Sequence, residues 1–175
     1  MARTMRTGLI VGLNGYASVA VFYAVFDLLA ARGALYSVDL LGKAVFRGLR
    51  DSSVLGLPIQ LDWAAIFWYN LLHLAAALII GVIVVGLVET AVRNPSRKGF
   101  VFYTIVLGFA VTVFAIAVLT LPIRPLLPWW SIVVANSFAV VIGGAYLLRR
   151  YPGIWDRLNP FAGRQNGHHA ALNGQ

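Results

Sequence analysis

Four long runs of apolar residues, separated by shorter polar stretches, dominate the pattern along this chain. They cover about residues 8–31, 62–89, 100–121 and 129–148. A helix needs roughly 20 mainly apolar residues to cross the hydrocarbon core of a bilayer, and each run is about that long. The pattern therefore predicts an all-α membrane protein with four transmembrane helices. Because the later connections are short, we expect an up-down-up-down bundle.

The first connection, from Arg32 to Asp62, has an amphipathic pattern of its own. Ser37 is a plausible N-cap, and the residues after it separate into two arcs. The apolar arc holds Leu40, Leu41, Val45, Phe46 and Leu49, and the polar arc holds Asp39, Lys43, Arg47 and Arg50. This pattern predicts a short amphipathic helix in the first outer loop. It lies either in the headgroup region or folded back over the end of the bundle.

Small residues recur on one face of each predicted span. Since lipid tails are as apolar as leucine, helices in a bilayer associate through close packing, which small residues allow. Thr104 and Thr112 flank the small residue of the third span at a spacing of four. We predict helix-packing roles for Gly8, Gly12, Gly81, Gly108 and Gly143.

Four polar residues inside the predicted spans form the candidate site: Asp27, Asn70, His73 and Asn136. Counted from the expected outer ends of the spans, a rise of about 1.5 Å per residue places all four between about 6 and 16 Å deep. They are predicted to share one polar layer between the first, second and fourth spans.

Two interpretations of this layer stay open. In the first, Asp27 and His73 form a buried acid and base that carry a proton, bind a quinone carbonyl or orient a small polar ligand. In the second, all four residues are interhelical hydrogen-bonding groups, each worth about 0.6 to 2 kcal/mol.

Composition narrows the class of protein. The chain of 175 residues is 60% hydrophobic and only 11% charged, which excludes an ordinary soluble domain. It has no cysteine, so disulfides, thiolate metal sites and Cys-ligated iron–sulfur clusters are excluded. We expect one membrane domain over residues 1–150 and a partly disordered cytoplasmic tail over residues 151–175.

The positive charge points to lipid as the partner and away from nucleic acid. The formal net charge is +8, but the cations lie in short clusters at the ends of the apolar runs. Nine of the 14 cations fall on the side of the N-terminus and five on the other. The nine are Arg3, Arg6, Arg93, Arg97, Lys98, Arg149, Arg150, Arg157 and Arg164, and the five are Arg32, Lys43, Arg47, Arg50 and Arg124. The positive-inside rule then predicts that both termini are cytoplasmic.

Counting the available ligands argues against catalytic, cofactor and metal sites. His73 is the only imidazole within the predicted spans, so a bis-histidine heme lacks its second axial ligand. One His and one Asp at membrane depth are too few for a metal site. No Ser-His-Asp context, phosphate-binding glycine loop or pair of catalytic carboxylates is recognisable. We expect no enzymatic activity, no cofactor and no metal.

The end of the first span and the connection after it carry a resemblance to known proteins. The segments Asp27-Leu-Leu-Ala-Ala-Arg32, Leu35-Tyr-Ser37 and Leu41-Gly-Lys-Ala-Val-Phe46 resemble a pattern in uncharacterised small bacterial four-span integral membrane proteins. His73 followed by Gly81 is similar to theirs as well. The resemblance covers roughly the first half of the chain. It implies a bacterial inner (plasma) membrane protein and transfers no catalytic residue.

Two functional hypotheses follow. The first is a non-enzymatic structural or accessory subunit of a membrane complex, assembled as a homo-oligomer or with other membrane subunits. The second is a small-molecule binding or transport unit with a polar site between the first, second and fourth spans. Secondary transporters usually show internal repeats and broken spans, and this sequence shows neither, which favours the first hypothesis.

Overall fold

The computed structural model describes residues 2–49 and 60–153, so Arg50 and most of the predicted tail lie outside the described residues. Within the described part the chain forms five α-helices and two short 3-10 helices. They are α1 (Ala2–Leu29), α2 (Tyr36–Phe46), α3 (Trp63–Arg93), η2 (Pro95–Arg97), α4 (Lys98–Leu119), η3 (Leu121–Ile123) and α5 (Trp129–Arg150). Four stretches are long and apolar enough to cross a membrane, namely α1, α3, α4 together with η2, and α5. The predicted all-α class and the four spans are confirmed.

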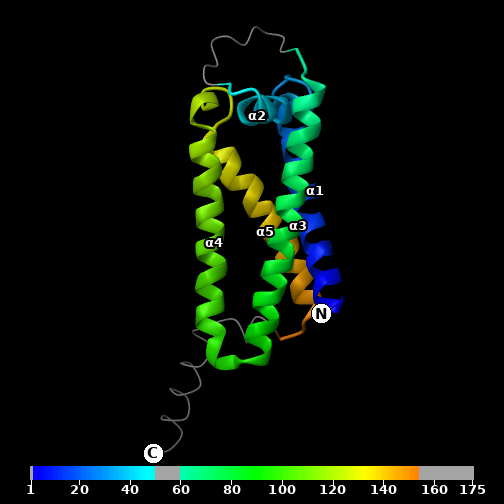
Figure 1. Cartoon of the computed structure of the whole chain (residues 1–175), viewed down its shortest axis with the longest axis vertical. Helices are drawn as coiled ribbons and strands as arrows, with labels where there is room; N and C mark the ends of the chain where they lie inside the picture. The colour runs from blue at the N-terminus through cyan, green and yellow to red at the C-terminus, as the bar shows by residue number, and fades with distance from the viewer. Residues whose placement is uncertain (1, 50–59, 154–175) are drawn as a thin grey trace, which may run out of the picture.

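The four long helices run in alternating directions, and α2 lies across one end of them (Figure 1). α1 packs against both α3 and α5. We call the end that carries α2 the α2 end. The opposite end, where α1 begins and α5 finishes, we call the basic end. Its cations within the described residues are Arg3, Arg6, Arg93, Arg97, Lys98, Arg149 and Arg150.

Close contact between α1 and α3 depends on three glycines. A Cβ atom added to Gly8 would lie 2.6 Å from the Cα of Val82, and one added to Gly12 would lie 2.5 Å from the carbonyl oxygen of Ala77. A Cβ on Gly81 would collide with the backbone of both Gly8 and Gly12. The two backbones therefore meet at a distance that only glycine permits at these positions.

The fourth span packs against the other side of α1 with ordinary side-chain contacts. A Cβ on Gly143 would lie 3.6 Å from Cγ1 of Val11, which is normal van der Waals distance. Near the basic end, buried Val11, Val85, Val88 and Leu147 form an apolar cluster shared by α1, α3 and α5. Gly143 thus lies at a contact between helices, but a residue with a Cβ atom would also fit there.

α4 stands along one side of the bundle, and Figure 1 shows it set apart from α3 and α5 over much of its length. Val101 is its one fully buried residue. A Cβ atom added to Gly108 would meet no heavy atom within 4 Å. The sequence predicts a packing role for Gly108, but among the described residues no other helix packs closely against it.

α2 folds back over the end of the bundle, which is the second of the two placements left open by its sequence. Its apolar residues Leu40, Leu41 and Ala44 are buried in a cluster with Ile123 and Leu127 from the connection between α4 and α5. The chain reaches α2 through a tight turn with Gly33 at φ 85°, a conformation that glycine adopts without strain. Protein, rather than lipid headgroups, covers this apolar face.

Helix boundaries differ from the predicted ones for a common reason. α1 begins at Ala2 rather than near Gly8, and α3 continues to Arg93 rather than ending at Glu89. Hydropathy locates the apolar part of a helix, whereas backbone hydrogen bonding continues into the headgroup zone, where charged side chains are solvated. At α2, Leu35 occupies the N-cap position instead of Ser37.

Candidate functional site

The predicted polar layer is divided between two places in the structure. Asn70 and His73 face α1 in the middle of the bundle. The hydroxyl of Tyr16 donates a hydrogen bond to Oδ1 of Asn70 at 3.0 Å, and Nδ2 of Asn70 donates to the Ile66 carbonyl at 2.9 Å. The His73 ring lies edge-on to the ring of Tyr16, with 5.2 Å between centroids. These contacts link α1 and α3 through one amide and two rings.

Asp27 lies at a different level, underneath α2. It is 0% exposed, and both of its carboxylate oxygens accept hydrogen bonds from Ser37. The Ser37 backbone N–H donates to Oδ2 and its hydroxyl donates to Oδ1, both at 2.7 Å. A buried carboxylate is costly unless its oxygens find donors, and here one residue supplies two of them. Asp27 therefore joins α1 to the start of α2.

The separation follows from the length of α1. Tyr16 marks the level of Asn70 and His73, and Asp27 lies about 16 Å further along α1 at a rise of about 1.5 Å per residue. From Asn70 to the start of α3 at Trp63 the same rise gives only about 10 Å. The depth estimate assumed that the outer ends of the spans share a plane, but α1 extends past the start of α3. Asp27 and His73 consequently do not form an acid–base pair.

Asn136 does not reach the other three residues either. Its Nδ2 donates to the carbonyl of Ile132, one turn earlier in α5, at 2.7 Å. Within the described residues, that bond to its own helix is the hydrogen bond the Asn136 side chain makes. The four candidates thus occupy three separate environments.

Arg32 closes the α2 end beside Asp27 without forming an ion pair with it in the described part of the chain. Its Nη1 donates to the Leu126 carbonyl at 2.9 Å. Its guanidinium lies over the rings of Phe26 and Tyr36, at 5.2 and 4.7 Å from their centroids. Such cation–π contacts hold a charge against apolar surface at low cost. Arg32 thereby connects α1 and α2 to the α4–α5 connection.

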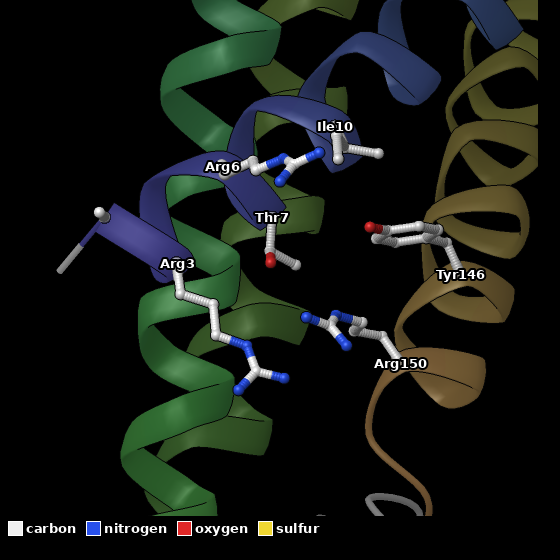
Figure 2. Close-up of a pocket in the computed structure, with 7 residues that line it drawn as sticks. Arg3, Arg6, Thr7, Ile10, Tyr146 and Arg150 are labelled. Atoms are coloured by element: carbon white, nitrogen blue, oxygen red, sulfur yellow. The ribbon is translucent and has the colours of Figure 1, made fainter.

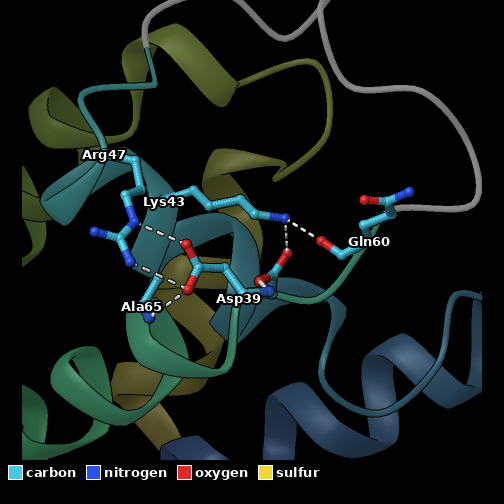
Figure 3. A network of polar contacts seen from close by, with 6 residues as sticks. Asp39, Lys43, Arg47, Gln60 and Ala65 are labelled. Atoms are coloured by element: carbon cyan, nitrogen blue, oxygen red, sulfur yellow. Dashed lines mark hydrogen bonds and ion pairs between the residues drawn. The ribbon is translucent and has the colours of Figure 1, made fainter.

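A second polar network fixes α2 to α3 (Figure 3). Asp39 belongs to the polar arc of α2, yet it is 0% exposed. Its Oδ2 accepts from Nζ of Lys43 at 2.6 Å, and its Oδ1 accepts from the backbone N–H of Asp62 at 2.7 Å. The polar arc of α2 is therefore turned partly toward α3.

Asp62 continues this network and begins α3. Its Oδ2 accepts from Nε of Arg47 at 2.7 Å, and its Oδ1 caps the helix by accepting from the N–H of Ala65 at 3.0 Å. The hydrogen bond from Arg47, followed by the one from Ala65, lowers the pKa of Asp62 to about 2. The same hydrogen bond raises the pKa of Arg47 above its usual value.

Gly42 is a residue that sequence reasoning did not select. A Cβ atom there would lie 2.6 Å from the carbonyl oxygen of Ala65, so α2 rests directly on the backbone of α3. The available signal was a glycine in the middle of a short helix, which lowers helix propensity unless close packing requires it.

At the basic end, Glu89 accepts hydrogen bonds from residues outside its own helix. It accepts from the hydroxyl of Thr4 at 2.8 Å and from the hydroxyl of Tyr151 at 3.0 Å, and Arg93 lies 3.4 Å away. Burial, and then the hydrogen bond to Glu89, raises the pKa of Tyr151. Glu89 therefore connects α3 to α1 and to the residue after α5.

Residues 2–49 and 60–153 bring together no group of three metal-ligating side chains. Comparison of the chain with protein-family models, with curated protein sequences and with solved structures found no match. The geometry of the bundle is therefore the basis for inferring its function.

Proposed function

We propose that this protein is a non-enzymatic accessory subunit of a membrane complex, and that it binds its partner through α4. The supporting observation is the contrast between α4 and the other spans. α1 and α3 meet through glycines that touch backbone, whereas α4 has one fully buried residue, Val101. The proposal extends to a bacterial inner membrane, in line with the resemblance in the first half of the chain.

Helix association in lipid requires close packing because there is no apolar driving force between helices. The stripe of Thr104, Gly108 and Thr112 offers a surface for such packing, and the space beside Gly108 is open. A transmembrane helix of another subunit, or α4 of a second copy, would complete this surface.

Gly108→Leu tests the proposal because it adds bulk where the chain itself has room. Unfolding of the isolated protein should not change, whereas association with the partner or with a second copy should be lost. Ala110→Leu is the matched control, since Ala110 is exposed on a different side of α4. The readouts are native mass spectrometry of the gently extracted protein and cross-linking from Gly108→Cys, which is clean because the chain has no cysteine.

A native mass equal to that of one chain, with no co-purifying subunit, would contradict the proposal. So would an equal loss of association in Gly108→Leu and Ala110→Leu, because that result would show no specific face on α4.

The small-molecule alternative draws less support, since its four residues lie in three environments. It now reduces to Asn70 and His73 beside Tyr16. His73→Ala discriminates between the two functions. We expect it to lower thermal stability and leave the set of co-purifying small molecules unchanged. Loss of a bound molecule at unchanged stability would favour the alternative.

For orientation, we propose that the basic end faces the cytoplasm. At the α2 end Lys43 and Arg47 are paired with Asp39 and Asp62. The difference in unpaired positive charge between the two ends is therefore larger than the difference in the number of cations. Reporters inserted between Asn94 and Lys98 and after Gly33 test this placement. Activity of a periplasm-dependent reporter at the first position would overturn it.

A further inference from the structure

A cavity of about 580 Å³ opens at the basic end between the first turns of α1 and the last turns of α5. Arg3, Arg6, Thr7 and Ile10 line it from α1, and Tyr146 and Arg150 line it from α5. Figure 2 shows Arg6 reaching from one helix, and Arg150 and Tyr146 from the other, into the space between them. The hydroxyl of Thr7 lies between these groups.

The charges around this cavity are not neutralised within the described residues. Arg3, Arg6 and Arg150 take part in none of the ion pairs found there. Glu89, the nearby acid, is already bonded to Thr4 and Tyr151 and lies beside Arg93. Three guanidinium groups at one cavity repel one another, and a bound anion would remove that repulsion.

The chemistry of the lining changes along the direction of the membrane normal. Arg3 and Arg150 lie at the outermost turns of their helices, while Ile10 and Tyr146 lie about one to two turns further into the bundle. The cavity thus presents cations at the level of lipid headgroups and an apolar or aromatic floor toward the hydrocarbon. A ligand that fits both parts has a phosphate at one end and a hydrocarbon chain at the other.

We propose that this cavity binds the phosphate group of an acidic membrane lipid. Guanidinium groups suit this role because their parallel N–H donors bind two phosphate oxygens at once. The hydroxyl of Tyr146 is a further donor for an ester oxygen. α1 presents its N-terminus to the cavity and α5 its C-terminus, so the electrostatic effects of the two helix dipoles oppose each other. The arginines therefore determine that the bound ligand is an anion. This site is independent of the partner surface on α4.

The experiment titrates the full-length protein in neutral detergent with phosphatidylglycerol, phosphatidylcholine or inorganic phosphate, and follows binding by native mass spectrometry. Hydrogen bonds between a guanidinium and a phosphate contribute at least about ten-fold each to binding, so Arg6→Gln combined with Arg150→Gln should weaken phosphatidylglycerol binding at least about 100-fold. The control, Arg97→Gln combined with Lys98→Gln, removes the same charge from the same end outside the cavity. It should bind phosphatidylglycerol like the wild type.

Equal weakening in both double variants would overturn the site, because it would indicate general attraction to a basic surface. Phosphatidylcholine binding as tight as phosphatidylglycerol would overturn it as well. Inorganic phosphate binding with equal affinity, and displacing the lipid, would identify a free phosphate compound as the ligand and overturn the lipid assignment.

If the glutamine variant does not fold, Arg6→Lys combined with Arg150→Lys replaces it and keeps the charge. Lysine lacks the paired donors of arginine, so we expect intermediate weakening. Wild-type affinity in the lysine variant would contradict recognition by guanidinium groups.

Discussion

The two ends of the bundle differ in whether their charged side chains have partners within the described chain. At the α2 end Asp27, Asp39 and Asp62 each accept at least two hydrogen bonds from within the chain, and Lys43 and Arg47 are paired with two of these acids. At the basic end Glu89 is the acid among the described residues, while Arg3, Arg6 and Arg150 surround an open cavity.

This difference separates charges that build the fold from charges that are available to the surroundings. Burying a carboxylate costs free energy unless donors surround it, so the acids of the α2 end are tied to one arrangement of α1, α2 and α3. Unpaired arginines at a membrane surface contribute little to folding but attract anions. The α2 end should therefore respond to mutation through stability and the basic end through binding.

The largest effect is expected from Asp27→Ala. This change removes the acceptor of two hydrogen bonds from Ser37 and should lower the free energy of unfolding by about 3 kcal/mol, since bonds to a charged group are worth about 1.5 to 3 kcal/mol each. Ser37→Ala removes one of them and should cost about half as much. Asn136→Ala is the control, because Asn136 bonds only within its helix in the described structure. Chemical unfolding in mixed micelles measures all three, and equal losses would contradict the assignment.

A smaller effect of opposite sign at the two ends is expected when glycine is replaced by alanine. Gly42→Ala places a Cβ against the Ala65 carbonyl and should cost about 1 to 3 kcal/mol by overpacking. Gly86→Ala, in the half of α3 nearer the basic end, meets open space and should stabilise by up to about 1 kcal/mol through helix propensity. Melting temperatures of both variants provide the comparison. A loss in both would show that crowding at Gly42 is not the cause.

Acid should weaken the α2 end through Asp62. Its pKa is lowered to about 2, chiefly by the hydrogen bond from Arg47, and an unfolded aspartate has a pKa near 3.9. The stabilisation is therefore complete above pH 4 and is lost as the pH falls from about 4 to 2. Melting temperatures of the wild type and Asp62→Asn should converge over this range. Parallel curves would show that the interaction with Arg47 contributes no net stability.

The smallest change in stability is expected at the basic end. Arg6→Gln removes one of three neighbouring cations that have no ion pair in the described structure, so unfolding should change by no more than about 0.5 kcal/mol. Thermal unfolding in a detergent free of acidic lipid is the appropriate measurement. A loss as large as that of Asp27→Ala would mean that Arg6 supports the fold, and the contrast between the ends would disappear.

Sequence patterns predicted the spans well and the polar contacts poorly, for one physical reason. The length and apolarity of a span are properties of neighbouring residues, so the four helices and α2 could be recognised directly. The partner of Asp27 depends on how far α1 extends past α3, and no local pattern records that offset. The packing at Gly12 and Gly81 was accessible because small residues repeated on one face of a span let a neighbouring helix approach closely, but Gly108 shows that the same pattern also occurs on an open face.

The burial of α2 also has a consequence for the order in which the protein is built. Leu40 and Leu41 are covered by Ile123 and Leu127, which a ribosome adds much later. At about 5 to 20 residues per second, several seconds pass before those residues emerge. During that interval the apolar face of α2 has no protein to cover it, and a membrane surface is the available alternative. We therefore expect α2 to occupy the two placements one after the other. It binds the headgroup region during synthesis and then covers the end of the finished bundle.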